Sequence, residues 1–416
     1  MNFFEELQWR GLVKDVTDLE GVIERLKTPV TVYCGFDPTA DSLHIGSLQQ
    51  IILLKRYQLA GHKVIPLCGG ATGMIGDPRP TTERGLQTLE QIADNVEGIR
   101  KQLSAFLDFS DEKAILVNNY DWLSKINVLS FLRDYGKYFN VNYMINKDVV
   151  ASRLQTGISF TEFTYTILQA IDWLHLYETF DCEMQIGGSD QWGNLTSGTE
   201  LIRKIKGDKA KVFGVTSPLI MNTDGSKFGK SEGGNIWLDA KRTGPYEFYQ
   251  YWLNVSDHDV IDFSKRLSLK TKEEIEQLEK SMKEEPHLRE AQKALAAELT
   301  ELVHGKDSLD SALKITKTLF GGDINELTFD ELKDGLADAP KSIIENNLNL
   351  VDALVASNIA SSKREARELI QNGSIMVNGE KIQTFDFLVS VDKAFNQEMT
   401  IIRKGKKKYF VLLFHE

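Results

Sequence analysis

Short apolar runs alternate with longer stretches of helical periodicity through the first half of the chain. Val, Ile and other apolar residues fill the runs, as in buried strands, and we expect strands at Val30–Cys34, Lys63–Cys68, Ala114–Asn118, Glu183–Ile186 and Val212–Val215. The stretches between them predict helices, among them Leu48–Leu59, Leu89–Phe106 and Asn194–Lys204. Strands that alternate with helices run parallel in one sheet, so residues 1–220 predict a doubly wound, Rossmann-like α/β domain. Ligands of such sheets bind beyond the carboxyl ends of the strands.

The pattern beyond Tyr246 is mainly helical. Helices are expected at Thr271–Ser281 and Glu290–Val303 and onward to about Phe320, so residues 221–320 predict a helical domain. Seven acidic residues and two lysines in residues 321–347 give that segment a net charge of −5 (two minus seven). This composition favours an acidic linker, with a short helix possible within it.

Residues 348–416 predict a small α+β module. Ser362–Glu365 has the sequence of a capping box and opens a helix that Gly373 ends. An Asn-Gly pair within Ile375–Ile382 predicts a hairpin, and Tyr409–Phe414 predicts a final strand. The module has ten Lys and Arg against eight Asp and Glu, in a chain whose formal net charge is −11.

Two basic clusters lie in this module, one on the expected helix and one before the last strand. Cations on a helix and in a nearby loop can follow the phosphates of a nucleic acid. A solvated charged face explains either cluster alone equally well. Two clusters in one small module of an acidic chain favour RNA, with the candidate contacts Lys363, Arg364, Arg367, Arg403, Lys404, Lys406, Lys407 and Lys408.

The overall composition excludes several classes of protein. The chain has 416 residues, 42% of them apolar and 26% charged, which is the balance of an ordinary globular protein. Three cysteines without a CxxC pair, and seven histidines without ligand spacing, predict neither a disulfide framework nor a protein-bound metal. No apolar run is long enough to span a membrane, and the first residues lack a secretion signal. We therefore expect a reduced, cytoplasmic protein without a membrane partner.

A glycine turn and a helix start follow the first expected strand. Asp41 or Ser42 can cap this helix, whose first turn then holds His44 and Gly46. The free N–H groups and positive dipole of a helix N-terminus suit phosphate, and a glycine there lets a flat ring approach the backbone. A histidine at a helix start also serves as a cap or in packing, so this segment alone leaves both interpretations open.

A second candidate for phosphate binding is the polar loop Asp224–Ser231. It carries Lys227 and Lys230, three residues apart, between glycines. Two ammonium groups on a flexible backbone suit a clamp on a phosphate chain. Taken alone, the same loop is simply an exposed turn.

The two segments together resemble a known pair of signatures. His-Ile-Gly-Ser at 44–47 and Lys-Phe-Gly-Lys-Ser at 227–231 are similar to the HIGH and KMSKS motifs of class I aminoacyl-tRNA synthetases. Four segments narrow the resemblance to the bacterial tyrosyl-tRNA synthetases: Tyr33–Gly46, Gly69–Pro78, Ile158–Asp172 and Gln185–Asn194. Residues 348–416 resemble the S4 RNA-binding domain of that family. The resemblance covers essentially the whole chain and makes residues 1–220 the catalytic domain and residues 221–320 the signature loop and anticodon-binding domain.

The resemblance implies a pocket for tyrosine. Tyr165, Gln169 and Asp172 lie at i, i+4 and i+7, so they share one face of a helix. Polar stripes are usually solvated, but a pocket for an amphiphilic amino acid needs this mixture of groups. In the family, Tyr33 and Asp172 contact the substrate hydroxyl. The resemblance also implies that Asp77, Tyr165 and Gln169 surround the α-ammonium group of the substrate tyrosine, with Gln191 nearby.

The resemblance also implies ATP as a substrate, with Mg²⁺ arriving on it. The implied ATP contacts are Cys34, Gly35, Asp37, Gly46, Ser47, Gly187, Asp190, Lys227, Lys230 and Ser231. The groups implied to act on the phosphates are Thr39, His44, Arg84, Lys227 and Lys230. Two features depart from the family. Ser47 stands where a histidine is usual, and the loop Gly76–Arg84 lacks a lysine, which Arg79 could replace.

The implied activity is that of a tyrosine–tRNA ligase, with L-tyrosine, ATP and tRNA(Tyr) as partners. The family also implies a homodimer formed through a helical insertion at about 120–155, although core packing would equally explain Tyr135, Tyr138 and Phe139. A tryptophan enzyme of the same class is one alternative, which Asp172 beside Tyr33 disfavours because an indole has no hydroxyl. A catalytically weak, RNA-binding relative is the other.

Overall fold

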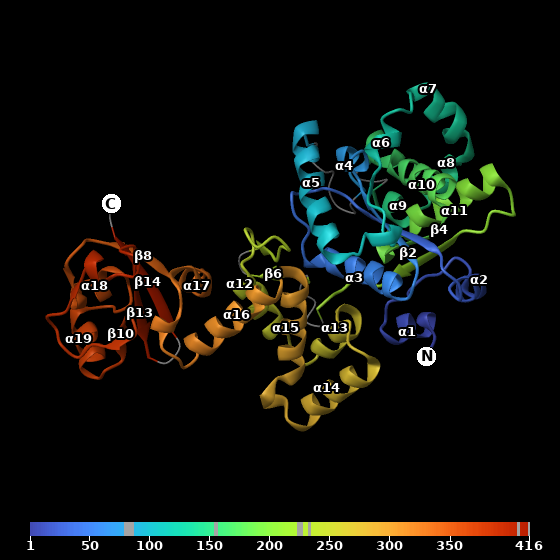
Figure 1. Ribbon diagram of the computed structural model, residues 1–416. Coiled ribbons are helices and arrows are strands. Elements are labelled where there is room, and N and C mark those ends of the chain that lie inside the picture. Colours follow the sequence, from blue (N-terminus) through green and yellow to red (C-terminus); the bar gives the residue numbers. More distant parts are fainter. Residues whose placement is uncertain (79–86, 154–156, 223–227, 232–233, 406–407, 415–416) are drawn as a thin grey trace. The chain divides into compact units, whose positions relative to one another are not determined.

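The structure is a computed structural model that describes residues 1–78, 87–153, 157–222, 228–231, 234–405 and 408–414. The chain forms two compact units (Figure 1). The first contains residues 1–242 and 254–295, and the second contains residues 243–253 and 296–416. No helix in the described ranges is long and apolar enough to cross a membrane.

The first unit is built on a five-stranded parallel sheet in the order β3-β2-β1-β4-β5. The strands are β1 (Thr31–Phe36), β2 (Lys63–Cys68), β3 (Val117–Asn118), β4 (Cys182–Gly188) and β5 (Phe213–Ser217). This arrangement confirms the doubly wound α/β prediction. The third strand is shorter than expected, because Ala114 makes only an isolated bridge to Val64. The strand order reverses between β1 and β4, so a ligand cleft belongs at their carboxyl ends.

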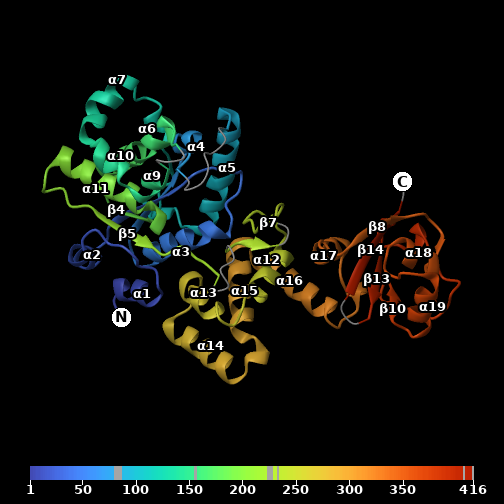
Figure 2. The same ribbon diagram turned by 180° about the vertical axis from the view of Figure 1, so that it is seen from behind.

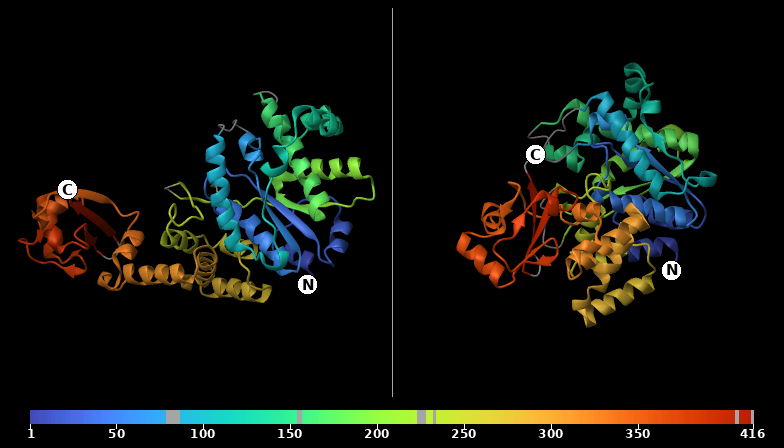
Figure 3. Two further views of the ribbon diagram at one scale, coloured as in Figure 1. Left: turned by 45° about the horizontal axis from the view of Figure 1, so that its top comes forward. Right: turned by 60° about the vertical axis from the view of Figure 1, so that its left-hand side comes forward.

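Four long helices cover the sheet, with α3 and α5 on one side and α10 and α11 on the other (Figure 3). They are α3 (Ile45–Leu59), α5 (Leu89–Phe106), α10 (Phe160–Phe180) and α11 (Trp192–Lys206). The shorter elements are α1 (Phe3–Trp9), α2 (Leu19–Arg25), α4 (Thr72–Ile75), α6 (Tyr120–Leu123), α7 (Val128–Ser130), α8 (Val141–Ile145), α9 (Asp148–Arg153), β6 (Lys230–Ser231) and β7 (Gly234–Asn235). Helices α13 (Val260–Leu267) and α14 (Lys272–Glu284) complete the unit, and α15 (Glu290–His304) leads into the next.

The insertion at 120–155 consists of short helices around one face of the core. Tyr135, Tyr138 and Phe139 are partly buried and pack against the cluster that contains Trp173 and Leu174 of α10. Core packing is therefore part of the role of these three aromatics. Other apolar side chains of the insertion remain exposed, among them Val128, Leu129, Leu132, Val141 and Tyr143.

The second unit combines helices with a mixed five-stranded sheet in the order β11-β10-β13-β14-β8, seen from behind in Figure 2. Its strands are β8 (Lys341–Ile344), β10 (Ile375–Val377), β11 (Glu380–Lys381), β13 (Met399–Lys404) and β14 (Lys408–Phe414), with β9 (Leu348–Asn349) and β12 (Leu388–Val389) forming a separate pair. Its helices are α12 (Pro245–Leu253), α16 (Lys306–Leu319), α17 (Phe329–Gly335), α18 (Leu350–Ala356) and α19 (Lys363–Gln371). The expected hairpin is formed by β10 and β11.

The acidic segment 321–347 is not a simple linker. It folds into α17 and β8, and β8 pairs in parallel with the last strand, β14. Leu327 and Leu332 are buried with Ile401 and Val411 in one cluster. Five of the seven acids are exposed, and Glu331 and Asp334 are partly buried. A net charge summed over the segment does not report the buried apolar side chains that join it to the terminal sheet.

Helix α19 begins and ends where the sequence predicts. Ser362 is the N-cap and accepts from the backbone N–H of Glu365, and Gly373 has φ 63° just after the helix. In a capping box, the Glu365 carboxylate would also accept from the backbone N–H of the N-cap residue, Ser362. A different residue makes this second bond. The Glu365 carboxylate accepts from Ser361, through its N–H at 2.7 Å and its hydroxyl at 2.6 Å.

Candidate active site

A cavity of about 370 Å³ lies at the carboxyl ends of β1 and β4, beside the start of α3. It brings together most of the residues that the sequence predicts for the amino acid and for ATP. They are Tyr33, Cys34, Gly35, Asp37, Thr39, His44, Gly46, Ser47, Asp77, Tyr165, Gln169, Asp172, Gly187, Asp190 and Gln191. Residues from five separate segments thus converge where the topology of the sheet predicts a ligand.

Tyr33 of β1 and Asp172 of α10 form a buried pair of polar groups in this cavity. The Asp172 carboxylate accepts from Asn119 Nδ2 at 3.0 Å and from Trp122 Nε1 at 2.8 Å. Burial raises the pKa of Asp172 to about 8, although these two bonds act in the opposite direction. The Tyr33 hydroxyl is buried and has no hydrogen-bond partner among the described residues. A buried hydroxyl without a partner is costly, so a ligand that supplies one is favoured here.

Asp77 and Asp37 provide two more carboxylates. Asp77 accepts from Gln191 Nε2 at 2.6 Å and from Asn194 Nδ2 at 3.1 Å. Burial raises the pKa of Asp77 to about 6. Asp37 accepts from the Tyr165 hydroxyl at 2.8 Å.

Hydrogen bonds connect the carboxylates to one another through neutral groups. Thr72 Oγ1 donates to Asp37 at 2.8 Å and accepts from Asn119 Nδ2 at 2.9 Å. Asn119 Nδ2 also donates to Asp172, so the network runs from Tyr165 through Asp37, Thr72 and Asn119 to Asp172. Such a network fixes the positions of the acceptors before any ligand arrives.

His44 itself caps helix α3. Its Nδ1 accepts from the backbone N–H of Gly46 at 3.0 Å, which assigns the ring proton to Nε2. The expectation that Asp41 or Ser42 caps the helix is wrong. Ser42 is buried and bonded to Gln102, while Asp41 pairs with Arg242.

Gly46 leaves room for the His44 ring. A Cβ atom at position 46 would lie 2.6 Å from His44 Cε1. Burial lowers the pKa of His44, so the neutral ring with an Nε2–H donor is favoured at the edge of the cavity.

The segment that follows the lysine loop is paired with the segment that carries His44. Ile45 donates its N–H to the carbonyl of Ile236 at 3.0 Å, and Leu238 donates to Leu43 at 2.9 Å. At the start of the loop, the rings of Phe228 and Phe263 lie 5.2 Å apart. Lys230 and Ser231 form β6, whereas the predicted site residues Lys227 and Arg84, and also Arg79, lie outside the described residues.

Comparisons with known proteins agree with this geometry. Residues 25–321 match the family "tRNA synthetases class I (W and Y)", and residues 331–412 match "Tyrosine--tRNA ligase SYY-like C-terminal domain". The chain belongs to the class I tyrosyl-tRNA synthetases. It is 52% identical over 418 residues to a tyrosine–tRNA ligase of Listeria welshimeri, covering 100% of both chains. It is 54% identical over 412 residues to that of Staphylococcus haemolyticus, covering 98% of both.

A solved structure supports the same assignment. A C-terminally truncated mitochondrial tyrosyl-tRNA synthetase of Aspergillus nidulans is similar with a TM-score of 0.68 and 31% identity, covering 76% of this chain and 94% of that chain. The synthetase described here is therefore an enzyme of the class I aminoacyl-tRNA synthetase family, with the fold that the resemblance implied.

The basic residues of the synthetase's terminal module differ in their surroundings. Arg364 and Arg367 are exposed on α19 and form no ion pair within the described ranges. Lys363 pairs with Asp352 at 2.6 Å, and Lys404 donates to the carbonyl of Ile359 and to Glu365. Arg403 is turned toward Met376 and Tyr409. Lys408 is exposed on β14, while Lys406 and Lys407 lie outside the described residues.

Four residues that sequence reasoning missed support the site of the synthetase: Thr72, Asn119, Trp122 and Asn194. Three of them had a weak signal in the sequence. Asn119 comes directly after an expected strand, where ligand-binding residues gather, and Thr72 and Asn194 lie within segments that resemble the family. Trp122 had no signal beyond its residue type.

Proposed function

We propose that this synthetase activates L-tyrosine with ATP, which releases pyrophosphate, and then transfers the tyrosyl group to the 3′ end of tRNA(Tyr). The observation that carries the choice of amino acid is the buried pair of Tyr33 and Asp172. A phenolic hydroxyl both donates and accepts, so it can bond Asp172 and Tyr33 at once. An indole N–H only donates, so it could bond Asp172 but would offer no acceptor to the Tyr33 hydroxyl. Phenylalanine would satisfy neither group.

The α-ammonium group of tyrosine is proposed to bind among Asp77, Tyr165, Gln169 and Gln191. Asp77 supplies the negative charge, and its bonds to Gln191 and Asn194 fix the carboxylate. The Tyr165 hydroxyl already donates to Asp37, which leaves its lone pairs for the ammonium.

Activation is proposed to be an in-line attack by the tyrosine carboxylate on the α-phosphate of ATP. This carboxylate is already a nucleophile, so the reaction needs no general base from the protein. The residues of the cavity then act by orienting the reactants and by stabilising charge on the phosphates. The described residues include no cluster of three or more acidic, His or Cys side chains that could hold a metal. Mg²⁺ would enter with ATP.

His44 is proposed to donate its Nε2–H to the phosphates from the N-terminus of α3, with Thr39 beside it. Its Nδ1 bond to Gly46 holds the ring in the tautomer that this role needs. Lys227, Lys230 and Arg84 are proposed to neutralise the leaving pyrophosphate, and Ser231 to assist on the same loop. The nucleoside part of ATP is assigned to Cys34, Gly35, Asp37, Gly46, Ser47, Gly187 and Asp190.

The second unit is proposed to hold the distant part of the tRNA. Arg364 and Arg367 on α19 are the best candidates for phosphate contacts, because both are exposed and unpaired within the described ranges.

We also propose that the enzyme acts in the cytoplasm as a homodimer. Its tRNA substrate and its three free cysteines support the compartment, and the exposed apolar side chains of the 120–155 insertion support the dimer.

The experiment that tests this function is the amino-acid-dependent exchange of pyrophosphate into ATP, followed by charging of tRNA. We expect exchange with tyrosine and none with tryptophan or phenylalanine at equal concentration. Exchange with tryptophan would identify the sister enzyme. Absence of exchange with both, combined with tRNA binding, would identify an RNA-binding relative instead.

A further inference from the structure

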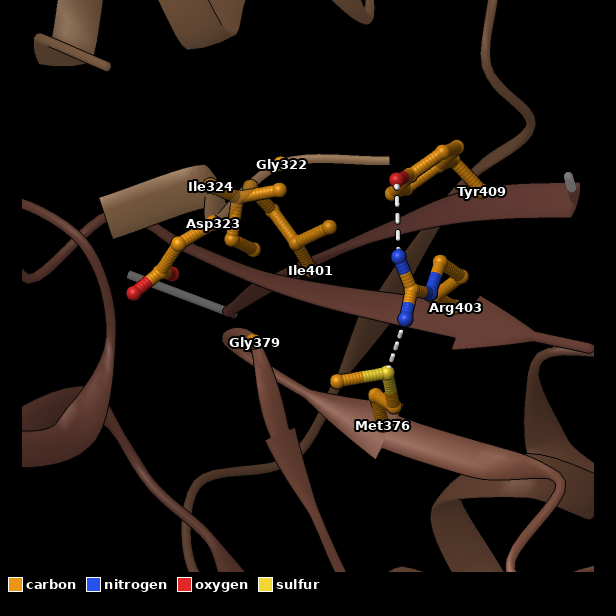
Figure 4. A pocket seen from close by; sticks show the side chains of 8 residues that line it. All are labelled: Gly322, Asp323, Ile324, Met376, Gly379, Ile401, Arg403 and Tyr409. Carbon is orange, nitrogen blue, oxygen red and sulfur yellow. Dashed lines mark hydrogen bonds between the residues drawn. The ribbon is translucent and has the colours of Figure 1, made fainter. Parts of the chain in front are cut away.

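A second cavity, of about 260 Å³, lies within the terminal module (Figure 4). It is formed between the turn that follows α16 and the face of strands β10, β13 and β14. Its lining residues are Gly322, Asp323, Ile324, Met376, Gly379, Ile401, Arg403 and Tyr409. The proposed function gives this cavity no role.

Most of the cavity wall is apolar and held in place. Ile324 and Ile401 are buried, and the phenol of Tyr409 is fixed by a 2.9 Å bond from its hydroxyl to the carbonyl of Leu319. Gly379, with φ 87°, brings the hairpin turn close to the opposite rim, where an added Cβ would meet Asn325 Nδ2 at 2.9 Å. The cavity is therefore a defined slot between packed elements.

The guanidinium of Arg403 lies at one end of this slot and has few hydrogen-bond acceptors for its N–H groups. Its Nη1 donates to the Tyr409 hydroxyl at 3.5 Å, and its Nη2 donates to the sulfur of Met376. Its Nε is buried and has no partner within the described ranges, where Arg403 also forms no ion pair. A thioether and a distant phenol oxygen are weak acceptors for a guanidinium that has five N–H groups.

Its neighbour in the chain, by contrast, donates to two strong acceptors. Lys404 lies on the other face of β13 and donates to the carbonyl of Ile359 at 2.8 Å and to Glu365 at 3.2 Å. Arg403 has no such acceptors, so its donors remain for an acceptor that comes from outside the chain.

The shape and polarity of the slot fit the base of a nucleotide. The slot has apolar walls, a guanidinium at one end and, at the opposite end, the carboxylate of Asp323 (Figure 4). A guanidinium pairs best with the O6 and N7 acceptors of guanine, and guanine's N1–H and N2–H₂ are donors that a carboxylate accepts. Adenine would turn an amino donor toward the guanidinium. A phosphate would meet apolar walls and a carboxylate of its own sign.

We propose that this slot binds an unpaired guanine of the tRNA substrate, with Arg403 reading its O6 and N7 edge. The inference rests on the proposed charging of tRNA and adds a base-reading site to it. It changes the role expected for Arg403, from a phosphate contact to a base contact. Single-stranded bases are the usual targets of sequence-specific RNA recognition, because their edges and faces are accessible.

The test is chemical probing of the tRNA with kethoxal, which modifies the N1 and N2 edge of unpaired guanines. We expect one guanine that reacts in free tRNA to become protected when the full-length wild-type enzyme is bound at saturation. The same guanine should react again in complexes with Arg403→Met, which removes the donors. It should also react with Met376→Phe, which fills the slot and keeps the charge.

A matched control is Arg367→Met, which removes an exposed cation of the same module. The affinity of Arg403→Met for tRNA should fall about 10- to 100-fold, with an unchanged slope of log affinity against log salt. The affinity of Arg367→Met should fall with a salt slope reduced by about one, while the guanine stays protected.

The outcomes separate the inference from the proposed function. A wild-type enzyme that charges tRNA but protects no unpaired guanine would overturn the guanine slot alone. So would a salt slope for Arg403→Met that falls as it does for Arg367→Met, since that marks a phosphate contact. A wild-type enzyme that neither exchanges pyrophosphate with tyrosine nor charges tRNA would overturn the proposed function and this inference with it.

Discussion

At the scale of single residues, the active site depends on acceptors that are ordered before a ligand arrives. Asp172 and Asp77 each accept two side-chain bonds from groups that carry no charge. The charged groups that act on them are other carboxylates, so burial dominates and both pKa values rise. The site therefore offers two carboxylates whose charge depends on pH near neutrality.

The raised pKa of Asp77 predicts how tyrosine binding responds to pH. The ammonium of tyrosine needs the ionised carboxylate, and Asp77 becomes protonated as pH falls through about 6. Protonation of Asp77 should therefore raise the Kd for tyrosine by up to tenfold per pH unit below 6 and should contribute little above pH 7. An aspartate with the ordinary value of 3.8 would give no change above pH 5.

Equilibrium dialysis of tyrosine between pH 5 and 8 measures this dependence. The Asp77→Asn variant should bind more weakly at pH 7.5 and lose the dependence near pH 6. Any change that remains near pH 8 in this variant belongs to Asp172, whose pKa is raised to about 8. A wild-type Kd that stays flat down to pH 5 would contradict the assignment of Asp77 to the ammonium.

Gly46 and His44 are predicted to act as one unit. An alanine at position 46 would displace the His44 ring, because its Cβ would lie 2.6 Å from Cε1. Gly46→Ala should therefore lower the kcat of pyrophosphate exchange by about 10²-fold, the usual cost of losing one transition-state donor, with little change in the KM for tyrosine.

A double-mutant cycle tests this coupling. His44→Asn keeps a side chain that can cap α3 but lacks the Nε2–H donor, and it should lose a similar factor. The double variant should be no worse than either single variant, because both remove the same interaction. Additive losses would instead mean that Gly46 has a separate role, such as close approach of the adenine ring.

At the scale of elements, the sequence predicts most of the first unit because its apolar periodicity is strong. Helix α5 has the predicted bounds, Leu89–Phe106, and its start is marked by a capping box between Thr88 and Gln91. Strand β2 likewise has its predicted bounds, Lys63–Cys68. In these elements local sequence and global packing favour the same structure.

In the acidic segment 321–347, composition allows the short helix that forms, α17, but does not predict the strand β8. In α17 the capping box of Thr328 and Glu331 is visible in the sequence, and Leu332 is fully buried. The pairing of β8 with β14 joins residues about seventy apart in the chain, which periodicity does not report. The supporting bonds of Asn119 and Trp122 were missed for the same reason, since only the fold brings them to Asp172.

At the scale of the whole molecule, the exposed apolar side chains of the 120–155 insertion predict a second copy of the chain as their partner. Leu129 is 75% exposed and Val128 is 68% exposed on α7, with Leu132 beside them. Separate exposed apolar residues are common, but several on one small insertion indicate an interface.

Light scattering coupled to size-exclusion chromatography should therefore give twice the chain mass for the wild-type protein. A double variant, Leu129→Asp with Leu132→Asp, should give the single-chain mass, because buried unpaired carboxylates strongly disfavour the interface. Leu59→Asp is the matched control, since Leu59 is also well exposed, at 64%, but lies at the end of α3 outside the insertion. If this control dissociates as fully as the double variant, or if the wild-type protein is monomeric, the interface does not lie on the insertion. If only the double variant dissociates, its rate of pyrophosphate exchange with tyrosine then measures how far the cavity of one subunit depends on the other.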